Sequence, residues 1–121
     1  MVELTKKQLR KIGEKVSGTD ALEKVLLKKF PDARITIIMG HATFPPGVGV
    51  YTEDAFFNKA QAKEAMDEIS SNETPSDTYH IVTGTVEELN DGEIHDTETG
   101  QTLYNLFRSI VYSSLLERLT E

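Results

Sequence analysis

The chain has 121 residues, a formal net charge of −7 and no cysteine. This length is typical of one domain, so residues 1–121 are expected to form a single α+β domain. The lack of cysteine excludes disulfide frameworks, thiolate metal sites, iron–sulfur clusters and cysteine nucleophiles. The first residues lack the apolar region of a signal peptide, and no stretch reaches the roughly 20 apolar residues that cross a bilayer. The sequence therefore predicts a cytoplasmic protein with no membrane partner.

The two signs of charge are segregated along the chain. Residues 1–30, the basic lead, carry eight basic and four acidic side chains, whereas residues 31–121, the acidic body, carry five basic and sixteen acidic ones. An acidic body repels phosphate backbones, which disfavours nucleic acid as a partner. Three interpretations of the basic lead remain open: a solvated helix face, a surface that docks on the acidic body of its own or a sister chain, or a contact for an acidic partner.

Helical structure is predicted throughout the basic lead. Apolar residues recur at helical spacing over residues 5–16, where Thr5 and Gln8 also have the spacing of a capping box. A second apolar stripe covers residues 21–30, and Pro31 ends it. These patterns predict either a pair of basic helices or one helix with a kink between the two stripes.

A buried strand is predicted directly after the basic lead. Residues 34–40 are rich in β-branched side chains and almost continuously apolar, which is typical of a strand buried on both faces. Residues 41–47 contain two prolines and are expected to form a loop, because proline donates no ladder hydrogen bond. A short strand over residues 48–51 and a helix from Thr52, as its N-cap, to Ser70 are predicted next.

The last third of the chain is predicted to form a hairpin and a helix. Residues 78–89 and 93–97 flank the triplet Asn-Asp-Gly at 90–92, whose residues tolerate the positive φ angles of a tight turn. A helix over residues 101–120 follows. The predicted fold is therefore α+β in the order α-α-β-β-α-β-β-α, with a small, mostly antiparallel sheet packed by helices.

The last predicted helix is unusually apolar. Its apolar side chains cover more than the roughly 100° stripe with which a surface helix faces a core. Two interpretations carry equal weight: the helix is enclosed within its own domain, or it forms a homodimer interface. The homodimer interpretation assigns the interface to Leu103, Phe107, Ile110, Val111 and Leu115.

The loop of residues 40–49 is the best candidate for a ligand site, because it joins a histidine, an aromatic residue and rigid prolines directly after a buried strand. Two plainer interpretations compete with it. A wide hairpin needs glycine and proline to turn, and a histidine on an apolar strand face is commonly a core residue. If the loop binds a small molecule, the predicted contacts are His41, Phe44, Tyr51, Asp54 and His80.

Catalytic motifs are absent from the sequence. It contains no phosphate-binding glycine loop, no Gly-x-Gly-x-x-Gly, no His-Glu-x-x-His and no Gly-x-Ser-x-Gly. We therefore predict no catalytic residue, no metal and no cofactor. The favoured hypothesis is a non-catalytic interaction protein, a small acidic homodimer of the adaptor, chaperone or immunity type that binds a protein partner. The alternative is a small-molecule binding protein or minor enzyme with its site around residues 40–49.

Overall fold

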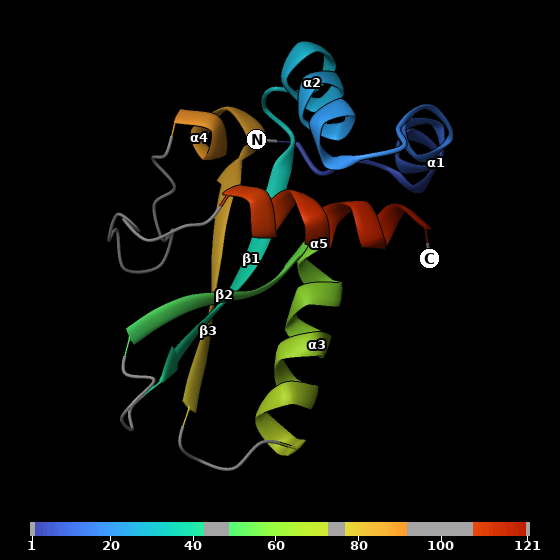
Figure 1. The fold of residues 1–121 in the computed structure, drawn as a ribbon. Helices are drawn as coiled ribbons and strands as arrows, with labels where there is room; N and C mark the ends of the chain where they lie inside the picture. The colour runs from blue at the N-terminus through green and yellow to red at the C-terminus, as the bar shows by residue number, and fades with distance from the viewer. Residues whose placement is uncertain (1, 43–48, 73–76, 92–107, 121) are drawn as a thin grey trace.

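The structure of the chain is a computed structural model, and it describes residues 2–42, 49–72, 77–91 and 108–120. Within these ranges the chain forms five helices and three strands, which Figure 1 shows in chain order. The elements are α1 (Lys6–Lys15), α2 (Thr19–Lys29), β1 (Arg34–Ala42), β2 (Gly49–Phe56), α3 (Lys59–Asn72), β3 (Asp77–Thr85), α4 (Val86–Asp91) and α5 (Arg108–Thr120). The predicted α+β class is confirmed.

The three strands form an antiparallel sheet in the order β2-β1-β3. Ile37 of β1 pairs with Ala55 of β2 and with Val82 of β3. The ladder between β1 and β3 is regular, whereas the register of β1 and β2 shifts between Ile38 and Met39, as at a β-bulge. The side chains from Ile35 to Met39 are fully buried, which confirms the prediction of a strand covered on both faces.

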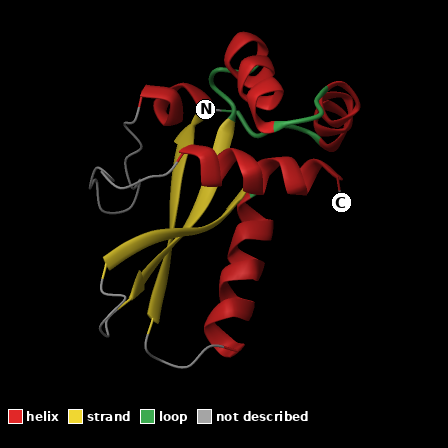
Figure 2. Ribbon diagram, in the orientation of Figure 1, coloured by secondary structure: helices red, strands yellow, loops and turns green. Residues whose placement is uncertain are grey.

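Helices cover both faces of this sheet, as Figure 2 shows. Helix α3 packs on one face, where Ile38 and Phe56 meet Ala62. Helix α5 packs on the other face against β2, and helices α1 and α2 contact α5 in turn. The larger part of the core lies on this second face, and it includes Leu22, Leu26, Ile35, Ile37, Met39, Val82, Val111 and Leu115. Within the described ranges, no helix has the length and apolar character needed to cross a bilayer.

The predicted helices of the basic lead are confirmed as two separate helices, α1 and α2. Thr5 caps α1, because its Oγ1 accepts a hydrogen bond from Gln8 N (3.2 Å) while Gln8 Oε1 accepts one from Thr5 N (2.9 Å). Gly18 precedes α2, and Phe30 ends it.

The helix predicted to start at Thr52 is wrong in its first turns. Strand β2 continues to Phe56, since Ala55 and Phe56 pair with Ile37 and Thr36 of β1 and are buried. Helix α3 begins at Lys59, where Asn58 Oδ1 accepts a hydrogen bond from Gln61 N (3.0 Å). Pairing with a buried strand thus prevails over a local capping signal.

The hairpin turn predicted at residues 90–92 is also wrong, because Asn90 and Asp91 belong to helix α4. Thr85 starts this helix with a capping box, in which its Oγ1 accepts from Glu88 N (3.1 Å) and Glu88 Oε1 accepts from Thr85 N (3.3 Å). Val86 and Leu89 then bury their side chains. The strand predicted at residues 93–97 lies outside the described residues, and β3 ends at Thr85.

Helix α5 has a partner within its own chain. Val111 and Leu115 are fully buried against the core, whereas Ile110 keeps 41% of its surface exposed. Val111 and Leu115, which the homodimer interpretation assigns to the interface, thus belong to the core of their own domain. Among the residues predicted for a dimer interface, Ile110 is the exposed one in this part, and Leu103 and Phe107 lie outside the described residues.

We expect Leu115→Ala to lower the free energy of unfolding by about 2–5 kcal/mol, because it leaves a cavity in the core. Ile110→Ala, five residues earlier on the same helix, is the matched control and is expected to cost about 0.5 kcal/mol or less. Urea denaturation followed by circular dichroism measures both. Equal losses would contradict the burial of Leu115.

Tyr112 places a phenol in the core beside these residues. Its side chain is buried, and its hydroxyl has no hydrogen-bond partner within the described part of the chain. Burial, reinforced by the nearby Glu23 carboxylate and opposed by Arg108, raises the pKa of Tyr112 from 10.0 to about 12. Between these values the unfolded chain loses the phenolic proton while the folded chain keeps it, so stability falls as pH rises.

Tyr112→Phe is therefore expected to remove part of the alkaline loss of stability, up to about 2 kcal/mol between pH 10 and 12. Urea titrations across this range measure the slope, and Tyr79→Phe controls for the removal of one tyrosine. An unchanged slope in Tyr112→Phe would contradict the assignment.

Candidate functional site

The residues predicted for a ligand site occupy all three strands. His41 is exposed in β1, which extends two residues further than predicted, and His80 is half-buried in β3. Tyr51 and Asp54 are half-buried in β2. Phe44 lies outside the described residues.

The strand register separates these residues onto two faces. Gly40 pairs with both Tyr51 and Tyr79, and the Tyr51 hydroxyl lies 3.4 Å from that of Tyr79, so the two tyrosines share a face. His41 follows Gly40 and therefore points to the opposite face. His80, which follows Tyr79, shares that face with His41. The structure thus places the two histidines on one face of the sheet and Tyr51 on the other.

Asp54 is engaged in holding the fold. Its carboxylate pairs with the guanidinium of Arg118 in α5, and its Oδ1 also accepts a hydrogen bond from Ala55 N (2.8 Å). The same guanidinium lies 4.2 Å from the centre of the Phe56 ring. These contacts fasten α5 to strand β2. Among the described residues, no group of three or more histidine and acidic side chains is arranged to hold a metal ion.

A continuous groove lies instead between α1 and α2, in the basic lead. Two adjoining pockets of about 220 and 310 Å³ form it, and they share Gln8, Lys29 and Phe30. We call it the lead groove. Its remaining lining residues are Val2, Leu4, Lys11, Ile12, Lys15, Val25, Pro31, Asp32 and Ala33.

The lead groove has an apolar floor. Leu4, Ile12 and Ala33 are buried beneath it. Phe30 is half-buried and lines both pockets, and Val2, at one end, is 55% exposed. Gln8 contributes to this wall and to the capping box of α1 at the same time. The groove therefore follows from the way α1 begins and from the packing of both α1 and α2 against α5.

Backbone pairing holds the segment that precedes α1. Val2 forms a parallel bridge with Ala33, in which Val2 N donates to Asp32 O (3.0 Å) and Arg34 N donates to Val2 O (2.7 Å). This end of the lead groove is therefore attached to the start of β1.

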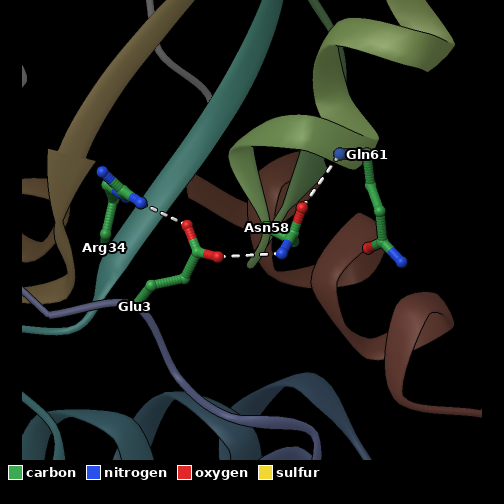
Figure 3. A network of polar contacts seen from close by, with 4 residues as sticks. All are labelled: Glu3, Arg34, Asn58 and Gln61. Atoms are coloured by element: carbon green, nitrogen blue, oxygen red, sulfur yellow. Dashed lines mark hydrogen bonds and ion pairs between the residues drawn. The ribbon is translucent and has the colours of Figure 1, made fainter.

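A side-chain network extends this attachment to α3, as Figure 3 shows. The Glu3 carboxylate accepts hydrogen bonds from the guanidinium of Arg34 and from Asn58 Nδ2 (2.8 Å). Asn58 Oδ1 in turn accepts from Gln61 N (3.0 Å). The network fixes the basic lead to both the sheet and the first turn of α3, which preorganises the groove.

The rim of the lead groove is positively charged. Lys11, Lys15 and Lys29 line it with exposed side chains, and Asp32 is the acidic residue among its lining. No basic residue of the lead takes part in an ion pair with another described residue. Two of its acids, in contrast, face arginines of the acidic body: Glu3 pairs with Arg34, and Glu23 lies 4.0 Å from Arg108. These pairs leave the lysines as the dominant charge.

Comparisons with protein-family models, with curated proteins and with solved structures find no match for this chain. Sequence reasoning noted the lysine-rich helix faces of the basic lead but missed the lead groove. Its floor is made of residues from two apolar stripes and from the segment before α1, so neither stripe indicates it alone.

The glycine at position 40 has a steric role that can be tested. A Cβ at Gly40 would lie only 2.6 Å from the Tyr51 hydroxyl and ring edge, because that ring crosses the strand toward Tyr79. We expect Gly40→Ala to cost about 1–2 kcal/mol of stability by displacing the ring.

In a Tyr51→Ala background the same substitution should be neutral or stabilising by up to about 1 kcal/mol, because glycine is a poor strand residue. The four stabilities, measured by urea denaturation, form a double-mutant cycle. If Gly40→Ala lowers the free energy of unfolding equally in both backgrounds, the Tyr51 ring is not the reason that glycine is required at position 40.

Proposed function

We propose that the chain is a non-catalytic protein-binding module whose lead groove holds an acidic, amphipathic segment of a protein partner. The observation that carries this proposal is an apolar groove rimmed by Lys11, Lys15 and Lys29, none of which is in an ion pair with a described residue. An occupant that satisfies both features needs apolar side chains for the floor and carboxylates for the rim.

The shape of the groove favours a segment of a protein. Its two pockets adjoin along α1 and α2, which suits successive apolar side chains of a helix or an extended peptide. Burial of each such side chain contributes roughly 25 cal/mol per Å² of apolar surface, and the lysines add orientation and a faster association. Affinity therefore derives mainly from the floor, and specificity from the rim.

Nucleic acid fits the groove less well. Base stacking needs aromatic platforms, and Phe30 is the aromatic residue among the groove's lining. The acidic body, with sixteen acidic and five basic side chains, also repels a phosphate backbone that extends beyond the basic lead.

A pair of designed peptides tests the proposal. Both are fluorescein-labelled amphipathic helices with identical leucine positions, and their polar positions carry glutamate in one and lysine in the other. We expect the acidic peptide to bind and the basic peptide not to bind, as measured by fluorescence anisotropy. Binding of the acidic peptide should weaken with salt but persist, because the apolar contacts are not screened.

Charge reversal locates the binding site. Lys15→Glu/Lys29→Glu should raise the dissociation constant of the acidic peptide by about tenfold or more, since both lysines line the groove. Lys24→Glu/Lys28→Glu makes the same change of net charge on exposed residues of α2 outside the groove and should have a much smaller effect. Equal losses in the two variants, or full competition by single-stranded DNA, would contradict the proposal.

A further inference from the structure

Among the described residues, strand β3 forms an edge of the sheet with the properties of a pairing surface, and we propose that two copies of this chain associate through it. Antiparallel pairing of the two β3 strands would join both sheets into one continuous sheet. The sheet order β2-β1-β3 leaves the outer side of β3 without a neighbour among the described strands. This inference is independent of the lead groove, which lies on α1 and α2.

The outer edge of β3 has few of the devices that normally prevent strand association, because its charged residue, Asp77, stands at its first position. It spans nine residues, pairs with β1 throughout without a bulge, and contains no proline, lysine or arginine. Proteins usually protect an exposed edge with such residues or with bulges. The other edge strand, β2, has both a bulge and a covering contact, because Arg118 of α5 pairs with Asp54. The contrast marks β3 as the edge that accepts another strand.

Apolar surface lies beside this edge. A groove of about 210 Å³ runs between α3 and β3, and it is lined by Lys59, Lys63, Met66, Tyr79, His80, Ile81 and Thr83. Met66, Tyr79 and Ile81 are only half-buried. A second copy seated on the edge would cover these side chains and supply hydrogen bonds to the outward backbone groups of β3.

The charge pattern of α3 selects a second copy as the occupant. Its first half carries Lys59, Lys63 and, near its end, Glu64, and its second half carries Asp67 and Glu68. Helix α3 runs opposite to β3 beside the sheet, as Figure 1 shows. A two-fold axis at the β3 edge would therefore place two α3 helices antiparallel on the same face.

In that arrangement the basic half of each α3 faces the acidic half of the other. Such an interface is self-complementary and closes after two copies, as most homodimer interfaces do. Pairing centred on Ile81 would place Tyr79 of one copy opposite Thr83 of the other, and both residues line the groove. An unrelated extended peptide would use the strand edge but would have no need of this charge pattern.

A charge-swap cycle tests the dimer. Lys63 and Asp67 are exposed and lie one helical turn apart, on opposite sides of the change in sign. Lys63→Glu and Asp67→Lys should each raise the dimer dissociation constant by roughly tenfold, because each creates two symmetry-related repulsions. The double variant restores opposite charges and should return the constant to within about threefold of the original.

Sedimentation equilibrium across a dilution series measures these constants, and circular dichroism verifies folding. A monomer at every concentration would overturn the proposal. A dimer whose dissociation constant is unchanged by both single substitutions, but which dissociates in Ile110→Glu, would also overturn the proposal and would assign the interface to α5.

Hydrogen exchange provides a readout specific to strand pairing. Alternate residues of an edge strand direct their N–H groups outward, and these groups become protected only when another strand pairs. We expect protection of alternate β3 amides to increase with protein concentration and to fall in Lys63→Glu. The groove variant Lys15→Glu/Lys29→Glu should leave it unchanged. Protection that is independent of concentration would contradict the dimer.

Discussion

The burial of β1 on both faces is the constraint on which the rest of the structure depends. Ile37 and Met39 point to one side and Ile38 to the other, and none of them is exposed. A strand of this kind is stable only if helices cover the sheet on both sides. Helix α3 covers the face that carries the smaller core cluster, and α5 covers the face that carries the larger one. Each remaining helix is placed by its contact with this central arrangement.

The position of the basic lead is one consequence. Helices α1 and α2 pack against α5, so they complete the core with one side and present lysines on the other. Their like charges are tolerated because exposed lysines are well solvated. The Glu3 carboxylate attaches the start of the lead to Arg34 and Asn58, which join it to the sheet and to α3. A groove with an apolar floor and a charged rim results where the two helices diverge.

The two edges of the sheet differ for a related reason. Helix α5 contacts the edge strand β2 through the pair of Arg118 with Asp54, whereas no described strand pairs with the outer side of β3. The lead groove and the β3 edge are therefore built from different elements. A partner seated between α1 and α2 would not occupy the edge at which a second copy pairs. Both associations can occur together, so the proposed dimer would present two grooves.

Local signals in the sequence determined α1, α2 and β1, because the capping box at Thr5 and the run of β-branched residues act over a few positions. Tertiary structure decided how far β2 and β3 extend and where α3 begins. Thr52 resembles a helix cap but pairs with Met39 in the sheet, and Asn90 resembles a turn but belongs to α4, which buries Val86 and Leu89. The lead groove requires two helices to pack side by side on α5, and no single apolar stripe determines the distance between them. Short sequence patterns predict local hydrogen bonds such as helix caps. Which of these local structures forms depends on the burial of side chains, and burial depends on residues far apart in the chain.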